Sequence, residues 1–376
     1  MRDLRELRVE IDEIDRKITE LYKRRTDIAG EVAEYKKKSG KPVFDQAREE
    51  EKLSVLSALG ETPFQKDSIH ELFQQIMAVS RKRQYQLLAE TGAFAGTGFV
   101  LLDTLCGSKE HVVFQGAEGA YTQLALKEYF KDEVCSYHVD TWRDAMEELS
   151  KGRAAYAVLP VENSSAGIIP EIYDLLVEYG HCIVGEQILR IDHALLGLPE
   201  AQYGDITDVY SHPQALAQCD AYLREHFAWE VHSMKNTAMA AQKIKGDGRK
   251  NAAAIASPQN AALYGLKVLD AAIQDQKLNA TRFLILTNRR VFVKEAQKIS
   301  ICFEAPHKSG ALYQMLSHFI YNGLNLNHIE SRPIPDKNWE YRFFVEFDGN
   351  LNDAAVESAL FGLSQEAICL KILGNY

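Results

Sequence analysis

The chain has 376 residues, of which 46% are hydrophobic, and carries a formal net charge of -10 at pH 7. This length and composition predict two or three domains with packed cores. The acidic balance argues against nucleic acid or an anionic membrane as the main partner, because basic surfaces bind both.

The cysteines and the most apolar stretch set further limits. Six cysteines occur between positions 106 and 369 without a close pair, which favours reduced thiols of a cytoplasmic protein over a zinc site or a disulfide framework. Residues 93–105 form the most apolar stretch, but it is short and includes Asp103. We therefore expect neither a signal peptide nor a membrane span.

The N-terminal stretch has the pattern of one long helix. Apolar residues recur at intervals of three and four from Leu4 to Lys36, which predicts an amphipathic helix. Arg25 interrupts the apolar stripe, so its side chain either extends to solvent or is a buried cation that needs an anion. At the rise of an α-helix this segment is about 50 Å long, more than one small domain covers. We therefore expect a partner helix.

Two further helices are predicted before residue 90. One starts at Pro42, and the other runs from about Asp67 to Leu88. Ser80 and Gln84 lie one turn apart on the latter and share a face. Surface polarity would be the ordinary explanation of such a pair.

Residues 4–86 resemble the all-helical chorismate mutase family. Eight polar residues occur in that family's order: Arg8, Arg25, Lys36, Asp45, Arg48, Glu49, Ser80 and Gln84. The resemblance implies that the arginines and Ser80 clamp the carboxylates of chorismate, while Lys36 and Gln84 donate to its ether oxygen. Asp45 and Glu49 would meet its hydroxyl. Such a site needs no nucleophile, only orientation and stabilisation of developing negative charge.

A change of pattern after residue 88 predicts the domain boundaries. Residues 89–108 contain four glycines and have the composition of a linker between parts. From His111, short apolar runs alternate with helical patterns, which indicates a mostly parallel α/β architecture. Strands are expected at 111–114, 134–139, 154–159, 207–211, 252–256 and 282–287. The predicted domains are 1–88, 109–290 and 297–376.

Three uncommon polar runs lie at strand ends in the α/β part. They are Glu162–Ser165, Ser211–Gln214 and Asn279–Phe283. Clefts at strand ends hold ligands in α/β proteins, and arginine forms a natural fork for a carboxylate. For the third run alone, a threonine that starts a strand beside a solvated arginine would be the ordinary interpretation.

Together the three runs resemble the prephenate dehydratase family, over about residues 111–287. The resemblance implies two α/β lobes with the site between them, where Asn163, Ser164 and Gln214 orient prephenate. Thr281 would donate a hydrogen bond to the leaving hydroxyl or relay a proton, because a threonine is a poor acid. Arg282 either binds a carboxylate or braces the cleft, and it is a weaker candidate for a site residue than Thr281.

The first loop of this part and one histidine receive weaker assignments. Residues 115–122 form a glycine loop that opens a helix and can offer N–H groups to an anion, although a tight turn is the simpler interpretation. The loop departs from the family at Ala120, which lacks the usual hydroxyl. His212 is expected to be structural.

The C-terminal part has another pattern. From Lys298 the order is strand, helix, strand, strand, helix, strand, which predicts a ferredoxin-like βαββαβ sandwich. Two short runs resemble the signatures of phenylalanine-binding ACT domains: Gly310, Ala311, Leu312 and Glu330, Ser331, Arg332, Pro333. Tyr313 replaces the usual valine. Glycine before a helix and proline ending a strand need no ligand, so phenylalanine binding rests on the resemblance.

Taken together, the parts resemble the bifunctional chorismate mutase/prephenate dehydratases of phenylalanine biosynthesis. The resemblance implies that the first part makes prephenate from chorismate, the second converts it to phenylpyruvate, and the third binds phenylalanine as an inhibitor. It also implies a homodimer or larger homo-oligomer. The sequence shows no metal cluster or nucleotide motif, so no cofactor is expected. The alternatives are a dehydratase with a degenerate mutase part and a non-catalytic amino-acid sensor. The eight polar residues argue against both.

Overall fold

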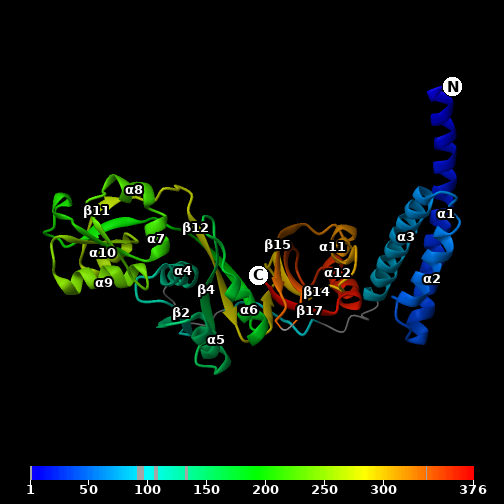
Figure 1. The fold of residues 1–376 in the computed structure, drawn as a ribbon. Helices are drawn as coiled ribbons and strands as arrows, with labels where there is room; N and C mark the ends of the chain where they lie inside the picture. The colour runs from blue at the N-terminus through cyan, green and yellow to red at the C-terminus, as the bar shows by residue number, and fades with distance from the viewer. Residues whose placement is uncertain (1, 91–96, 106–108, 132–133, 336) are drawn as a thin grey trace. The chain divides into compact units, whose positions relative to one another are not determined.

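The computed structural model describes residues 2–90, 97–105, 109–131, 134–335 and 337–376 (Figure 1). The chain forms two compact units, one of residues 1–98 with 297–372 and the other of residues 99–296 with 373–376. The N-terminal helices and the C-terminal part, predicted as separate domains, therefore belong to one unit. The linker glycines at 92, 96 and 107 lie outside the described residues.

Three helices form the N-terminal part of the first unit: α1 (Leu4–Ser39), α2 (Gln46–Ser57) and α3 (Pro63–Ala89). The predicted start of α2 at Pro42 is wrong, because Asp45 caps this helix by accepting a 3.1 Å hydrogen bond from the Arg48 amide. The third helix starts earlier than predicted, at Pro63, since Thr62 and Gln65 form a capping box there. None of the helices in the described ranges combines the length and apolarity that a membrane crossing requires.

The long first helix is confirmed, and much of its apolar stripe is uncovered. Leu4, Ile11 and Leu21 have exposed fractions of 58%, 55% and 66%. Only Ala29 and Ala33 are buried among the helix residues. An apolar stripe of this length in water is unfavourable for a chain on its own. The partner helix stays a prediction.

The C-terminal part of the first unit follows the predicted order of elements: β14 (Lys298–Glu304), α11 (Ala311–Tyr321), β15 (Leu326–Pro333), β16 (Tyr341–Asp348), α12 (Ala354–Glu366) and β17 (Cys369–Asn375). The strands lie in the order β15-β16-β14-β17, and β16 is antiparallel to both neighbours. Phe303, Phe319 and Leu360 are part of a core that the sheet shares with both helices.

Helix α3 packs on α11 and α12. Tyr85 of α3 is fully buried, and its ring meets the Phe361 ring edge-on at 5.6 Å. Gly362 permits this approach, because a Cβ there would come within 2.6 Å of His318 Nδ1 and 3.0 Å of the Tyr85 ring. Within this unit the N-terminal helices and the C-terminal part therefore share a close-packed interface.

The second unit contains two α/β lobes. The first lobe holds β2 (His111–Gln115), β3 (Cys135–Val139), β4 (Tyr156–Asn163), β5 (Gly167–Ile168), β6 (Cys182–Arg190), β12 (Ala280–Thr287), α4 (Tyr121–Phe130), α5 (Trp142–Ser150) and α6 (Pro170–Tyr179). The second holds β7 (Ala194–Gly197), β8 (Asp208–Ser211), β9 (Glu230–Ser233), β10 (Ala252–Ala256), β11 (Lys267–Ala271), η1 (Tyr203–Asp205), α7 (Pro213–Ala217), α8 (Asp220–Glu225), α9 (Thr237–Asp247) and α10 (Gln259–Tyr264).

Both sheets are mixed, so the expectation of mostly parallel strands is wrong. In the first lobe β2 is parallel to β3 and β4, whereas β12 is antiparallel to β4 and β6. In the second lobe β8 is parallel to β9 and β10, whereas β7 is antiparallel to β10 and β11. The chain crosses between the lobes at residues 191–193 and 272–279.

The antiparallel pairing of β12 positions the polar runs. Thr281, at the start of β12, lies opposite Asn163 at the end of β4. In Figure 1 these two strands run side by side in the first lobe. A short strand, β1 (Val100–Leu102), lies inside the predicted linker and pairs in parallel with β13 (Val291–Val293).

Candidate active sites

A cavity of about 220 Å³ in the N-terminal helices, here named the helical pocket, gathers most of the predicted N-terminal site. Thirteen residues line it: Arg25, Lys36, Val43, Asp45, Arg48, Glu49, Lys52, Leu56, Phe73, Met77, Ser80, Arg81 and Gln84. Seven of the eight polar residues predicted from the sequence are among them. The exception, Arg8, is not a lining residue.

Two cations of α1 enter the helical pocket half-buried. Arg25 donates to the Ser80 hydroxyl and, at 3.4 Å, to the carbonyl of Ile76. Lys36 Nζ donates to the carbonyl of Val43 at 2.7 Å. Burial lowers the pKa of both side chains below their ordinary values, although nearby acids oppose this effect. Of the two interpretations of Arg25, neither holds fully: the side chain is half-buried rather than extended to solvent, and it lines the pocket.

The polar groups of α2 and α3 complete the pocket wall. Gln84 donates through Nε2 to the Ser80 carbonyl at 3.2 Å, and its buried Oε1 has no hydrogen-bond partner. Arg48 is exposed and pairs with Glu51 at 2.6 Å. An unpaired buried amide oxygen is costly unless a ligand or water meets it, so this oxygen of Gln84 is open to an occupant of the pocket.

Arg81 is a lining residue that sequence reasoning missed. Only 4% of it is exposed, and it binds Glu49 of α2 and Glu366 of α12. In the sequence it stands in a run of three basic residues that looks like a solvated helix face. Its partner Glu366 is 285 residues away, so no local signal could have identified the pair.

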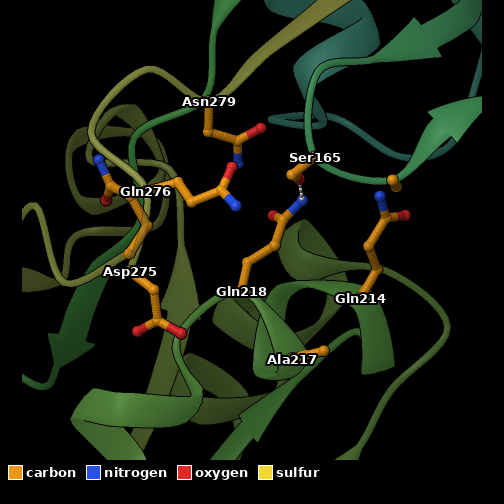
Figure 2. Close-up of a pocket in the computed structure, with 9 residues that line it drawn as sticks. Ser165, Gln214, Ala217, Gln218, Asp275, Gln276 and Asn279 are labelled. Carbon is orange, nitrogen blue, oxygen red and sulfur yellow. Dashed lines mark hydrogen bonds between the residues drawn. The ribbon is translucent and has the colours of Figure 1, made fainter.

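A second cavity, of about 250 Å³, lies between the lobes of the second unit and is named here the amide pocket (Figure 2). It is lined by Ser165, Ala166, Gln214, Ala217, Gln218, Gln274, Asp275, Gln276 and Asn279. Figure 2 shows the Gln218 side chain, which follows α7, extending toward Ser165. Of the five residues predicted for this site, only Gln214 lines the cavity.

Asn163 is the centre of the hydrogen bonds behind the amide pocket. Its Nδ2 donates to Thr281 Oγ1 and to Asn279 Oδ1, both at 2.9 Å. Its Oδ1 accepts from the Ser165 hydroxyl at 2.7 Å. Because the Thr281 oxygen accepts from Asn163, its own O–H proton can be donated to another acceptor. The structure thus brings two predicted residues, Asn163 and Thr281, into contact.

The side chains of Ser164 and His212 form hydrogen bonds to the backbone around the amide pocket. The Ser164 hydroxyl donates to the carbonyl of Leu278 at 3.2 Å and accepts from the amide of Ala280 at 3.0 Å. His212 caps α7, since its Nδ1 accepts from the Gln214 amide at 3.1 Å. These contacts agree with the expected structural role of His212. They also link Ser164 to the end of the segment, residues 272–279, that crosses between the lobes.

Arg282 points away from Thr281, because neighbouring side chains alternate between the faces of a strand. Its Nε donates to Glu186 at 2.6 Å, and a terminal nitrogen donates to the Tyr376 hydroxyl at 3.0 Å. Of the two roles considered for Arg282, bracing the lobe is the one whose contacts are present.

Gln218 and His193 extend the hydrogen bonds across the lobes. Gln218 donates to Ser165 Oγ at 2.9 Å, the dashed line in Figure 2, and its Oε1 lies 2.9 Å from His193 Nε2. The Tyr121 hydroxyl lies 3.0 Å from His193 Nδ1. Burial lowers the pKa of His193, although Gln218 and Asp192 oppose this, so burial favours the neutral ring.

Sequence reasoning could have found one of these residues. Gln218 lies one helical turn after Gln214, so a helix starting at Pro213 presents both amides on one face. His193 has no comparable signal, because it lies in a crossing segment whose strands were not predicted.

Asn279 supplies a free donor to the amide pocket. It is 1% exposed, and its Nδ2 has no hydrogen-bond partner. The nine lining residues include no lysine or arginine, and Asp275 is the one acid among them. The side-chain donors on this lining are therefore neutral, and the buried Nδ2 of Asn279 is one that has no hydrogen-bond partner.

A group of possible metal ligands lies elsewhere in the second lobe. Ligand atoms of Asp208, Glu230 and His232 lie within 4.8 Å of one another. However, His232 contacts Asp208 at 3.1 Å, and the guanidinium of Arg249 lies 3.7 Å from the same carboxylate. The carboxylate is already paired with a cation, so this cluster is a poor fit for a metal ion.

Family models match both pocket-bearing parts of the chain. The chorismate mutase type II model matches residues 7–85, and the prephenate dehydratase model matches residues 112–291. The bifunctional chorismate mutase/prephenate dehydratase of Pseudomonas aeruginosa is 33% identical over 379 residues, which cover 99% of this chain and 97% of the relative.

Solved structures match most of the chain. The prephenate dehydratase of Arthrobacter aurescens, solved in complex with L-Phe, superposes with a TM-score of 0.65 at 29% identity, covering 71% of this chain and 89% of that one. GqqA, described as a quorum-quenching acylase, has a TM-score of 0.65 at 31% identity, with 71% and 97% coverage.

Proposed function

Because the chain belongs to the family of bifunctional chorismate mutase/prephenate dehydratases, we propose that its two pockets are the two active sites of that family. The helical pocket lies within the part that matches chorismate mutase, and the amide pocket within the part that matches prephenate dehydratase. The observation that carries the proposal is the convergence of seven predicted polar residues on one cavity.

In the helical pocket the reaction is the Claisen rearrangement of chorismate, in which one C–O bond breaks as one C–C bond forms. Arg25, Arg48 and Ser80 clamp the substrate carboxylates and hold the reactive conformer. Lys36 and Gln84 donate to the ether oxygen, where negative charge develops. The lowered pKa of Lys36 reflects partial burial, and electrostatic stabilisation is larger in such a site than in water.

The substrate hydroxyl meets the acids at the start of α2, Asp45 and Glu49. Arg8 completes the site from a second copy of the chain, because it lies on α1 outside the lining of this pocket. The exposed apolar stripe of α1 supports this arrangement, since the same stripe of a partner can cover it.

In the amide pocket prephenate loses its ring carboxylate as CO₂ and its ring hydroxyl as water. The electron pair of the breaking C–C bond enters the ring, the C–O bond breaks, and the departing hydroxide takes a proton. Thr281 donates its free O–H to that hydroxyl while Asn163 holds its oxygen. Gln214 and Gln218 orient the substrate from α7, and Ser164 and Arg282 keep the surrounding chain in place.

The C-terminal part is proposed to be an ACT domain that binds phenylalanine and inhibits the dehydratase. Support comes from the βαββαβ order of its elements and from the left-handed Gly310 (φ 75°) directly before α11. The relative from Arthrobacter aurescens was solved with L-Phe, which is consistent with such a site. The strand with Glu330 to Pro333 is at the sheet edge, where a second copy can pair with it.

Two substitutions in the full chain test the assignment. Lys36→Ala removes a donor from the helical pocket and should abolish prephenate formation from chorismate while dehydration of supplied prephenate continues. Thr281→Ala should do the reverse. If either folded variant loses both activities, the two pockets are not independent active sites.

A further inference from the structure

The guanidinium of Arg81 joins the helical pocket to the C-terminal part of the same unit. One terminal nitrogen donates to Glu49 Oε2. Its Nε donates to Glu366 Oε1 at 2.8 Å, and the other terminal nitrogen lies 3.4 Å from Glu366 Oε2. The Phe44 ring lies 4.8 Å from the guanidinium carbon. Arg81 is thus fixed on three sides.

The charges of this group are buried to different depths. The side chains of Arg81 and Glu366 are 5% and 4% exposed, whereas that of Glu49 is 22% exposed and faces the pocket. Burial favours the neutral acid, but His318 and Arg81 outweigh it and hold the pKa of Glu366 at about 2. Glu366 is therefore a permanent anion that holds Arg81 at the wall of the helical pocket.

We propose that Arg81 and Glu366 are positioning residues of the mutase site, through which the C-terminal part holds Glu49 in place. This inference rests on the proposed assignment of the helical pocket. Arg81 occupies one Glu49 oxygen, so the other faces the substrate hydroxyl in a fixed direction. Without this contact a glutamate in the first turn of α2 would sample several rotamers.

The neutral variant Glu366→Gln separates positioning from general damage. This substitution weakens the contacts between Arg81 and residue 366, and it removes one negative charge beside the helical pocket. A dianionic substrate should then bind no more weakly, while Glu49 loses its fixed position. We expect mutase kcat to fall about tenfold, equivalent to about 1.4 kcal/mol, without a rise in KM. An unchanged kcat, or a loss seen only as a raised KM, would overturn the proposal.

A double-mutant cycle tests whether the effect passes through Glu49. In a Glu49→Gln background, Glu366→Gln should lower mutase kcat by less than about twofold, because the residue that it positions has already been changed. A full further tenfold loss would show that Glu366 acts by another route. Arg81→Lys keeps the charge but cannot form a fork to two carboxylates, so it should reproduce the loss in kcat.

The matched control is Glu304→Gln. Glu304 is also a buried acid of the C-terminal part, but it pairs with Arg342 at 2.8 Å. The Glu304→Gln substitution should leave mutase kcat unchanged. In every variant, the rate of dehydration of supplied prephenate should report whether the chain is folded. Lys36→Ala distinguishes a failure of the pocket assignment from a failure of the positioning role. If Lys36→Ala keeps mutase activity, the helical pocket is not the mutase site. If Lys36→Ala abolishes mutase activity while Glu366→Gln and Arg81→Lys keep it, only the positioning role of Glu366 and Arg81 is wrong.

Discussion

Neutral donors around the amide pocket suit a reaction in which a carboxylate must leave. A guanidinium paired with the ring carboxylate would stabilise the ground state, and that interaction would be lost as CO₂ forms. Asn279, Gln214 and Gln218 instead offer amides, and the nearby Arg282 is turned away and paired with Glu186. In the proposed dehydratase site, these amides would thus hold the substrate without opposing decarboxylation.

A substitution at Asn279 tests most directly whether the amide pocket binds prephenate. Asn279→Asp keeps the oxygen that accepts from Asn163 but replaces the unpaired donor with a second anionic oxygen. Repulsion of the dianionic substrate and loss of the donor should lower dehydratase kcat/KM by about 100-fold. Asn236→Asp is the control, because Asn236 caps α9 and aspartate caps equally well. Equal kcat/KM values for the two variants, measured with supplied prephenate, would exclude Asn279 from binding.

His193 should make the second unit sensitive to acid. Burial lowers its pKa in the folded chain, so below about pH 6.5 the unfolded chain binds a proton that the folded chain does not. The free energy of unfolding should therefore fall as pH drops below that value. Its slope with pH should be smaller in His193→Gln, by up to about 1.4 kcal/mol per pH unit.

Urea unfolding between pH 5 and 8 measures this slope. His138→Gln, at an exposed histidine of the same unit, serves as the control and should keep the slope of the original chain. A slope that is unaffected by His193→Gln would mean that this ring does not stay neutral in the folded chain.

At the scale of single elements, the length of α1 bears on how the proposed mutase site is completed. Arg8 and Arg25 are 17 residues apart in sequence, which is about 26 Å along a straight helix. The two carboxylates of chorismate lie within one small molecule, so both arginines cannot reach it from one chain. Each site should therefore take its Arg8 from the partner copy.

Mixed refolding tests the shared site. Subunits with Arg8→Ala and subunits with Lys36→Ala should each be inactive as mutases. Refolded together, they should regain up to about a quarter of the sites, because half of random pairs are mixed and each mixed pair has one intact site. Verified mixed dimers without mutase activity would show that each site is built from one chain.

The sequence predicts elements here better than it predicts the pairing of elements. The three-four spacing of α1 and the apolar runs of β2 and β10 are local patterns, and their elements lie at the expected positions. The direction of β12 is not local, because an apolar run reads the same in either pairing. The contact of Asn163 with Thr281 depends on that direction, so the motifs could be identified but their geometry could not.

The same distinction applies to the sites. The polar residues of the helical pocket follow helical spacing, and seven of them line one cavity. Arg81, Gln218 and Asn279 act through partners from distant parts of the chain. Burial turns an ordinary basic or amide residue into part of a site, and burial depends on the tertiary structure.

At the scale of the whole molecule, the C-terminal part of the chain is divided between the two compact units. Glu366 reaches the helical pocket through Arg81. The last four residues, 373–376, belong to the second unit, where Gly374 of β17 pairs with Ile183 of β6 and the Tyr376 hydroxyl accepts from Arg282. Strand β17 (Cys369–Asn375) therefore begins in the first unit and ends in the second.

Phenylalanine should act through this C-terminal part rather than by competing in the amide pocket. Gly310 has a left-handed backbone directly before α11, and no atom lies within 4 Å of the position that a Cβ would take. An amino acid bound to this turn can approach the backbone closely only without that Cβ. Allosteric coupling typically changes affinity about 5–150-fold, corresponding to about 1–3 kcal/mol.

Gly310→Ala should therefore raise the phenylalanine concentration needed for half-inhibition of the dehydratase by at least about tenfold, and leave the uninhibited rate unchanged. Gly323→Ala is the matched control: Gly323 is also left-handed (φ 66°), has equally open surroundings and lies in the same part of the chain, but outside the proposed effector turn. Both substitutions carry a similar backbone strain of about 1 kcal/mol, so a difference between them reports the ligand and not the fold. Unaltered inhibition in Gly310→Ala, together with inhibition that prephenate relieves competitively, would place phenylalanine in the amide pocket instead.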